Sequence, residues 1–259
     1  MDYNKKELIP FLRRALREDI GKRDITTRLF IPKDKQIKAV ILAKQDCVVC
    51  GLDIARLVFK ICDKKVVFKA RVNDGEFIRS QKILAEIQGS AQGILTAERV
   101  ALNFLSLLSG IATKTRRYVD TVRPYRVKIM DTRKTLPGLR KLEKYAVKIG
   151  GGYNHRMRLD EMVLVKDNHF KVVSPQFLDV SFKKIIERRE RKIPKGMKIE
   201  VEVKSIEEFK QALKMKPDII MLDNMDTKEI KRALRIRDSL PATYYPIPKL
   251  EVSGGVNLK

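Results

Sequence analysis

The chain has 259 residues, 44% of them hydrophobic, which is enough to bury a sizeable core in one large or two modest domains. No uninterrupted apolar run reaches about 18 residues, so we expect no membrane span, and the charged N-terminus does not resemble a secretory signal. The formal net charge of +24 is common among nucleic-acid-binding proteins. However, the basic residues are spread along the whole chain and form no DNA- or RNA-binding motif. We interpret the excess as a surface property that also attracts anionic substrates.

The cysteine content argues against a disulfide scaffold, because Cys47, Cys50 and Cys62 are the only three. The spacing of Cys47 and Cys50 is also found in metal and redox sites. Here it lies in a strand-like run, where residues three apart point to opposite faces, and no second such pair exists. We therefore expect a buried structural role and a reducing cytoplasmic location.

The first part of the chain has the pattern of a small α/β domain. A helix over 5–18 precedes short β-rich runs between residues 25 and 95, with one helix near 53–61 among them, which predicts a mostly antiparallel sheet. A long apolar helix is then expected to begin with Thr96 as its N-cap. Arg99 would lie on the first turn of that helix, where a solvated charge or an ion pair with a nearby acid is the simplest interpretation.

From residue 127 onward, strand-like and helix-like segments alternate. This pattern predicts βα units with a parallel sheet, either in a barrel or in an open doubly wound arrangement. Polar groups follow the carboxyl end of each strand, where βα barrels place their active sites. The expected strands are 127–130, 162–165, 199–203, 218–222 and 249–252, and the expected helices lie near 139–149, 179–192, 205–215 and 227–238.

The stretch 131–169 is rich in groups that bind anions. It contains both histidines of the chain, His155 and His169, and the consecutive glycines 150–152. Planar guanidinium groups and point-like ammonium groups alternate there with Gly and Asn, which predicts a pocket for a small molecule with several negative charges. The cations concerned are Arg133, Lys134, Arg156 and Lys166.

Glu200 and Glu202 alternate with aliphatic residues in the third expected strand, so both should point toward the barrel interior. An unpaired buried carboxylate is costly, so each needs a cation or a metal. Asp223 ends the next strand, and we expect Glu202 and Asp223 side by side at the barrel mouth, where two carboxylates suit Mg²⁺. The alternative is a salt bridge from these carboxylates to Lys134 or Lys166. The salt bridge and the metal site can both form, one in the free and the other in the liganded state.

A possible phosphate site follows the last expected strand. It consists of Ser253, Gly254 and Gly255. Small residues let backbone N–H groups approach an oxyanion closely. Glycine pairs end many strands, so this feature alone is weakly specific.

Eight segments, in order along nearly the whole chain, resemble quinolinate phosphoribosyltransferases, also called nicotinate-nucleotide diphosphorylases (carboxylating). They are EDIGKRDITT (18–27), TAERVALNFLSLLSGIAT (96–113), DTRKTLPGLRKLEKYAV (131–147), GGGYNHR (150–156), LVKDNH (164–169), EVEV (200–203), LDN (222–224) and EVSGG (251–255). The resemblance implies an α/β fold, with an N-terminal open α/β sandwich over 1–110 and an open-faced, incomplete βα barrel over 111–259. It also implies that this barrel lacks the segment with which members usually end.

The resemblance further implies a reaction. The ring nitrogen of quinolinate attacks the anomeric carbon of phosphoribosyl pyrophosphate (PRPP), diphosphate leaves, and the 2-carboxylate is lost as CO₂, which gives nicotinate mononucleotide for NAD biosynthesis. The nucleophile is already a lone pair, so catalysis is a task of positioning and electrostatics.

The roles of individual residues follow from the matching motifs. Glu202 and Asp223 would hold Mg²⁺ and the ribose hydroxyls, and Lys134 would bind the diphosphate. Arg99 would reach quinolinate from the neighbouring subunit of a homodimer or larger assembly. The quinolinate contacts within the subunit would be Arg133, His155, Arg156 and Lys166, and the 5′-phosphate would be cradled by Ser253, Gly254 and Gly255.

Two other functions remain open at this point. One is a paralogous phosphoribosyltransferase with another acceptor, like the molybdenum-transport-associated relatives of this family; Lys166 in the KDNH run argues against it. The other is a catalytically weakened nucleic-acid binder, which predicts steeply salt-dependent binding of generic DNA or RNA but leaves the ordered motifs unexplained.

Overall fold

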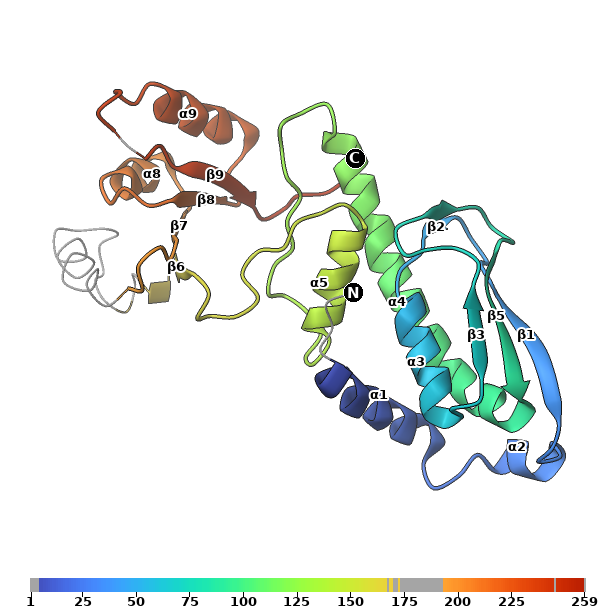
Figure 1. The fold of residues 1–259 in the computed structure, drawn as a ribbon. Helices are drawn as coiled ribbons and strands as arrows, with labels where there is room; N and C mark the ends of the chain where they lie inside the picture. Colours follow the sequence, from blue (N-terminus) through green and yellow to red (C-terminus); the bar gives the residue numbers. More distant parts are fainter. Residues whose placement is uncertain (1–4, 167, 170–171, 173–192, 245, 259) are drawn as a thin grey trace. The chain divides into compact units, whose positions relative to one another are not determined.

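The computed structural model describes residues 5–166, 168–169, 172, 193–244 and 246–258, shown as a ribbon in Figure 1. The chain divides into two compact units, Met1–His155 (unit 1) and Arg156–Lys259 (unit 2). The predicted helix over 179–192 lies outside the described residues. The predicted domain boundary at residue 110 falls within one unbroken helix, Ala91–Val122.

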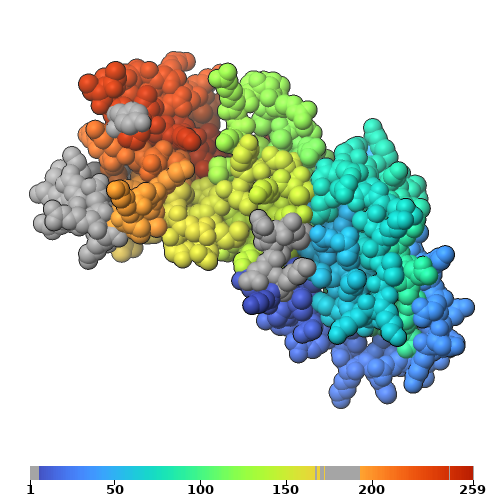
Figure 2. Space-filling model, in the orientation of Figure 1, coloured from blue at the N-terminus to red at the C-terminus, as the bar shows by residue number. Residues whose placement is uncertain are grey.

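Unit 1 is built on a three-stranded antiparallel sheet, in agreement with the sequence-based prediction. Its order is β1–β5–β3, and β2 and β4 form a separate two-stranded ribbon. Figure 2 shows its blue to green segments packed into one continuous surface. The elements are α1 (Lys5–Ile20), α2 (Ile25–Phe30), β1 (Gln36–Leu42), β2 (Cys47–Val48), α3 (Leu52–Cys62), β3 (Val67–Ala70), β4 (Phe77–Ile78), β5 (Ile83–Ser90), α4 (Ala91–Val122) and α5 (Arg140–Ile149).

The helix α4 begins earlier than predicted. Its N-cap is Ser90, whose hydroxyl accepts a hydrogen bond from the N–H of Gly93 at 3.4 Å, and β5 passes directly into the helix. Thr96 therefore lies inside α4 and is not its N-cap; its hydroxyl donates to Asp24 at 3.0 Å. The prediction was wrong because a strand that runs straight into a helix leaves no loop to mark the boundary. Arg99 accordingly lies beyond the first turn.

Length and composition alone would allow α4 to cross a membrane. Within unit 1, however, one side of this helix forms part of the core, where it packs against α3, α5 and β2. Its buried residues include Val100, Phe104, Leu105 and Leu108. Such packing is typical of the central helix of a globular unit.

The three thiols are free; Cys50 is buried, in agreement with the structural role predicted for the Cys47–Cys50 pair, whereas Cys47 is only partly buried. The N–H of Cys50 donates to the hydroxyl of Ser109 on α4 at 3.0 Å, which fixes the end of the cysteine-containing segment against the helix. Burial raises the pKa of the Cys62 thiol to about 11, and it also raises the pKa of Cys47 and of Cys50. A thiol with a raised pKa is a poor nucleophile at neutral pH.

Unit 2 contains a parallel sheet in the order β6–β7–β8–β9, as expected for βα units. Its described strands are β6 (Val163–Val165), β7 (Ile199–Val203), β8 (Ile219–Asp223) and β9 (Lys249–Ser253), and its described helices are α8 (Ile206–Leu213) and α9 (Thr227–Asp238). One face of the sheet is aliphatic and packs on these helices, with Val201, Val203, Ile220 and Leu222 fully buried. This arrangement leaves the opposite face for polar side chains.

The strand predicted over 127–130 is absent from the described elements. Met130 forms only an isolated parallel bridge with Tyr153. Val127 and Met130 are 59% and 40% exposed, so this segment has little apolar burial to extend the pairing. The prediction was wrong because aliphatic residues favour a strand only where neighbouring strands cover them.

Candidate functional site

A buried ion pair fixes the start of the cation-rich loop in unit 1. Lys144 on α5 is 1% exposed, and its ammonium group contacts the carboxylate of Asp131. The ammonium also donates to the carbonyl oxygen of His155 at 2.9 Å, and Asp131 accepts the N–H of His155 at 2.9 Å. Burial raises the pKa of Asp131, while hydrogen bonds from Lys144 and His155 act in the opposite direction. The ion pair therefore fixes the backbone of His155 through both its N–H and its carbonyl group.

The same helix positions Arg133. On α5, Arg140 donates to the Arg133 carbonyl oxygen at 3.5 Å, and Glu143 accepts the N–H of Leu136 at 3.2 Å. Glu143 and Lys144 follow Arg140 by three and four positions, so both are its neighbours on the helix surface. The Arg133 side chain, by contrast, has a buried Nε with no acceptor among the described residues. A buried donor without a partner is costly, so this guanidinium is suited to an anion.

Two of the three glycines after α5, Gly150 and Gly152, allow close packing against α4. A Cβ at Gly150 would lie 2.5 Å from the carbonyl oxygen of Ala112, and one at Gly152 would lie 2.9 Å from a methyl group of Thr115. Only glycine allows this approach. The packing anchors the segment that leads to His155.

The polar face of the unit 2 sheet follows from strand register. Parallel pairing places Glu202 beside Met221, Met221 beside Glu251, and Asp223 beside Ser253, and paired residues point to the same side. Glu200 and Glu202 alternate along β7 with Val201 and Val203, so both glutamates point away from the aliphatic face, where they are 0% and 6% exposed. Asp223 lies diagonal to Glu202 on the neighbouring strand, so the two carboxylates share one face. Glu251, which the sequence did not single out as a site residue, also lies on it.

Glu202 is paired with a lysine. The ammonium of Lys166, just after β6, donates to Glu202 Oε2 at 2.9 Å. The lysine side chain is 43% exposed and the glutamate side chain 8%. Of the two partners predicted for this carboxylate, the structure supports Lys166, and the bond uses only one carboxylate oxygen.

Arg156, a predicted site residue, and His169, the second histidine of the stretch 131–169, both make hydrogen bonds within unit 2. Arg156 donates to the carbonyl oxygen of Met162 at 2.8 Å, and so ties the start of the unit to the segment before β6. His169 accepts the N–H of Lys166 through its Nδ1 at 2.9 Å. This histidine is exposed and shapes the turn that presents Lys166.

The turn after β9 contacts the end of β8. The N–H of Asn224 donates to the carbonyl oxygen of Ser253 at 2.8 Å, and its side chain donates to Asp223 at 3.1 Å. Gly254 and Gly255 have φ values of +83° and +64°, a region that disfavours other residues. The structure thus brings Asp223 together with the predicted phosphate-binding residues.

Some of the predicted site residues lie in unit 1 and the others in unit 2. Unit 2 gathers Lys166, Glu202 and Asp223 on one sheet face, next to the turn over 253–255. Unit 1 holds Arg99 exposed on α4, with no hydrogen bond or ion pair to the residues that the structure describes. The other predicted residues of unit 1 are Arg133, Lys134 and His155, in the segments that α5 fixes.

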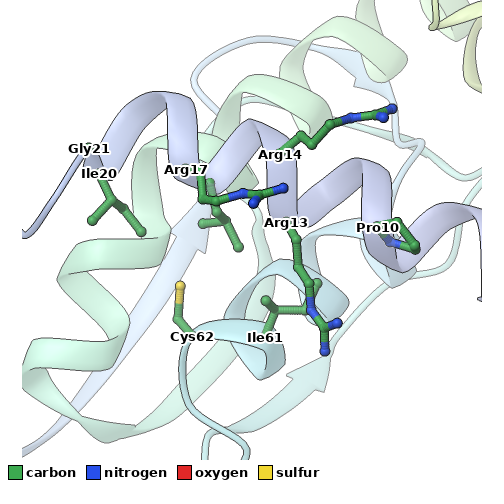
Figure 3. Close-up of a pocket in the computed structure, with 9 residues that line it drawn as sticks. Pro10, Arg13, Arg14, Arg17, Ile20, Gly21, Ile61 and Cys62 are labelled. Carbon is green, nitrogen blue, oxygen red and sulfur yellow. The ribbon is translucent and has the colours of Figure 1, made fainter.

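A separate cavity of about 610 Å³ lies between α1 and the end of α3 (Figure 3). Its apolar lining includes Ile20 and Ile61, and its cations are Arg13, Arg14 and Arg17. Figure 3 shows Arg13 and Arg14 extending in different directions, so they do not converge on one ligand position. None of the predicted site residues lines this cavity.

Comparison with known proteins places these features in one family. The family models described as quinolinate phosphoribosyl transferase, N-terminal domain and C-terminal domain, match residues 24–109 and 111–259. The chain is 42% identical over 254 residues to a probable nicotinate-nucleotide pyrophosphorylase [carboxylating] of Methanocaldococcus jannaschii, covering 97% of this chain and 86% of the relative. It is 40% identical over 253 residues to the nicotinate-nucleotide pyrophosphorylase [carboxylating] of Mycobacterium leprae, covering 96% and 84%.

Solved structures agree with the sequence comparison. The crystal structure of NadC from Streptococcus pyogenes aligns with a TM-score of 0.88 at 37% identity, covering 99% of this chain and 86% of that one. The nicotinate-nucleotide pyrophosphorylase of Francisella tularensis aligns with a TM-score of 0.86 at 34% identity, covering 99% and 86%. The predicted fold class, an N-terminal sheet domain followed by a barrel-like α/β domain, is thereby confirmed. The chain belongs to the quinolinate phosphoribosyltransferase family.

Proposed function

We propose that this protein transfers the phosphoribosyl group of PRPP to the ring nitrogen of quinolinate, with release of diphosphate and CO₂, and so forms nicotinate mononucleotide. Family membership over nearly the whole chain supports this reaction. Within the structure, the observation that carries it is the buried Nε of Arg133, which lacks an acceptor among the described residues. A planar guanidinium with an unsatisfied donor is the group that a carboxylate of quinolinate would satisfy.

Quinolinate carries two adjacent carboxylates, so its binding needs several cations. Arg133 and Arg156 supply guanidinium forks, Lys166 supplies an ammonium group, and His155 supplies a ring that hydrogen-bonds the substrate. Holding both carboxylates fixes the direction of the ring nitrogen lone pair toward the anomeric carbon. This orientation replaces a bimolecular encounter by a reaction between positioned groups.

Once the nitrogen is ribosylated, its positive charge stabilises the electron pair that the departing CO₂ leaves on C2, and C2 then takes a proton from water. The protein needs no base for this step, because no proton is removed from carbon. The residues must hold the ring in one orientation, so that the 2-carboxylate keeps a single position. Lys134, which is exposed in the segment that precedes α5, would bind the diphosphate.

Glu202 and Asp223 are the residues that would hold Mg²⁺. Carboxylate oxygens suit this hard cation, and both residues lie on one sheet face that also carries Glu200 and Glu251. Four acids on one face favour a cation there, and the Lys166 bond uses only one oxygen of Glu202. The bound metal would neutralise charge on the diphosphate as it leaves.

The 5′-phosphate of PRPP would bind at the turn over Ser253, Gly254 and Gly255. Consecutive residues with positive φ direct backbone N–H groups to one side, which makes a nest for an oxyanion. Asp223 lies beside Ser253 in the strand register. The 5′-phosphate of PRPP and the Mg²⁺ beside its diphosphate would thus bind at the ends of the neighbouring strands β9 and β8.

We further propose a homodimer, or a larger assembly of dimers, in which Arg99 enters the partner's site. The exposure of Arg99 and its lack of an ion pair among the described residues support this role. A cytoplasmic location is part of the same proposal, since free thiols persist in a reducing compartment.

The test is formation of nicotinate mononucleotide from quinolinate, PRPP and Mg²⁺, with nicotinate as the control acceptor. We expect product from quinolinate only. Arg133→Ala should abolish turnover, whereas Arg79→Ala, an exposed arginine of the same unit that pairs with Asp46, should leave it unchanged. Product from another pyridine acid but not from quinolinate would support the paralogue, and RNA binding that survives Arg133→Ala without any turnover would support the nucleic-acid binder.

A further inference from the structure

Asn224 links two parts of the proposed PRPP site. It follows β8 with a φ of 56°, a left-handed conformation that Asn adopts more readily than most residues. Its backbone N–H donates to the carbonyl oxygen of Ser253 at 2.8 Å. Its Nδ2 donates to Asp223 Oδ2 at 3.1 Å. One residue therefore contacts both the carboxylate at the end of β8 and the turn after β9.

The carboxamide of Asn224 occupies the space where a side chain at residue 254 would lie. A Cβ at Gly254 would come within 2.1 Å of Asn224 Oδ1 and 2.5 Å of its Cγ. The carboxamide would have to rotate away to make room, and the hydrogen bond to Asp223 would then be lost. By contrast, a Cβ at Gly255 would meet nothing within 4 Å. The close approach is specific to Gly254.

We propose that Asn224 is a positioning residue that couples the Asp223 carboxylate to the turn over Ser253, Gly254 and Gly255. This proposal rests on the proposed function, in which Asp223 helps to hold Mg²⁺ beside the diphosphate of PRPP and the turn over 253–255 binds its 5′-phosphate. A substrate with anions at both ends is aligned only if its two binding groups keep a fixed separation. The hydrogen bonds of Asn224 set that separation across the β8–β9 edge.

The first experiment removes the carboxamide. Asn224→Gly keeps the backbone N–H and tolerates positive φ, so it isolates the side chain. We expect KM for PRPP to rise about tenfold, as for the loss of one hydrogen bond to a charged group, with KM for quinolinate unchanged. A role in folding alone would lower the yield of folded enzyme and leave KM for PRPP at its wild-type value, which would refute the proposal.

The second experiment measures the coupling. Gly254→Ala should raise KM for PRPP through both the strained φ and the collision with Asn224, and adding Asn224→Gly should recover the part due to the collision. Gly255→Ala carries strain without collision, so Asn224→Gly should give no recovery there. Equal effects of Asn224→Gly in both backgrounds would overturn the proposal.

Thermal unfolding separates this inference from the proposed function. Gly196 has the same φ of +83° as Gly254 but nothing within 4 Å of a Cβ. Gly254→Ala should therefore lower Tm more than Gly196→Ala, and Asn224→Gly should remove the difference. If the wild-type protein turned over no quinolinate, the proposed function would fail, yet the Tm comparison would still establish or exclude the Asn224–Gly254 contact.

Discussion

The ammonium group of Lys144 and the carboxylate of Asp131 form an ion pair inside unit 1, with side chains 1% and 7% exposed. Their bonds extend to the N–H and carbonyl groups of His155. Asn154 adds a third contact, because its carboxamide nitrogen donates to the second oxygen of Asp131 at 2.7 Å. The segment that carries two of the proposed substrate-binding residues is thus held by buried charges outside the substrate site itself.

Lys144→Met should destabilise the protein by about 3–5 kcal/mol, because it leaves the buried Asp131 carboxylate without its cation. The free energy of unfolding from urea titration measures this loss. Lys141→Met is the matched control, since Lys141 lies on the same helix and pairs with Glu7 at the surface; its cost should stay below about 1 kcal/mol. Equal costs for the two variants would show that burial of the pair is unimportant.

Glu202→Gln should raise the Mg²⁺ concentration needed for half-maximal turnover by on the order of tenfold or more, because it removes an anionic oxygen from the proposed metal site. Steady-state rates over a Mg²⁺ titration at fixed PRPP test this. Lys166→Met breaks the same ion pair from the other side but keeps the carboxylate. It should instead raise KM for quinolinate, and a shift in the Mg²⁺ requirement of similar size would contradict the assignment.

Arg99→Ala and Arg133→Ala should each be inactive, but mixing the two variants and allowing subunits to exchange should restore about a quarter of wild-type activity. Half of the resulting dimers would be mixed, and one of their two sites would be intact. Activity of the mixture after exchange is the measurement. A mixture of Arg133→Ala with Lys166→Met is the control, since both residues serve the same subunit's site, and it is assayed at a quinolinate concentration too low for Lys166→Met to turn over. Recovery there, or none in the first mixture, would rule out a shared site.

Asp24 provides a test of pH dependence. Hydrogen bonds from Thr27, with a smaller contribution from Thr96, lower the pKa of this N-cap carboxylate below 3.8. An acid with a lowered folded-state pKa stabilises the fold above its unfolded pKa, and this stability is lost as pH falls through the folded value. Asp24→Ala should therefore cost about 1 kcal/mol at pH 7, and the difference from wild type should close below pH 3.8.

Urea titrations between pH 7 and pH 3 measure that difference. The control is Asp34→Ala, at an exposed aspartate outside the helices, whose cost at pH 7 should stay within about 0.5 kcal/mol. A cost for Asp24→Ala that stays constant as the pH falls through the folded-state pKa of Asp24 would mean that the neutral acid caps the helix as well as the carboxylate does.

Much of the architecture was predictable from local pattern. Short aliphatic runs predicted β6 to β9, and the alternation in β7 predicted that Glu200 and Glu202 share the polar face, because side chains in a strand alternate between faces. The order of motifs also pointed to the family. These features depend on neighbours within a few residues, which the sequence displays directly.

The start of α4 and the absence of a strand at 127–130 were not predictable in this way. Ser90 caps α4 because β5 delivers the chain directly to the helix, and the bridge at Met130 stays isolated because no strand among the described residues extends its pairing with Tyr153. Both outcomes depend on what lies next to the segment in space. Local propensity does not contain that information.

By itself, the sequence determined the alternation of elements, the residue types of the site and the family. Only the tertiary structure decided which of these groups meet. Lys144 reaches Asp131 across 13 positions, and Asn224 fills the space at Gly254 across the β8–β9 edge. Such contacts arise from packing and strand register, which bring distant residues together, so no local pattern specifies them.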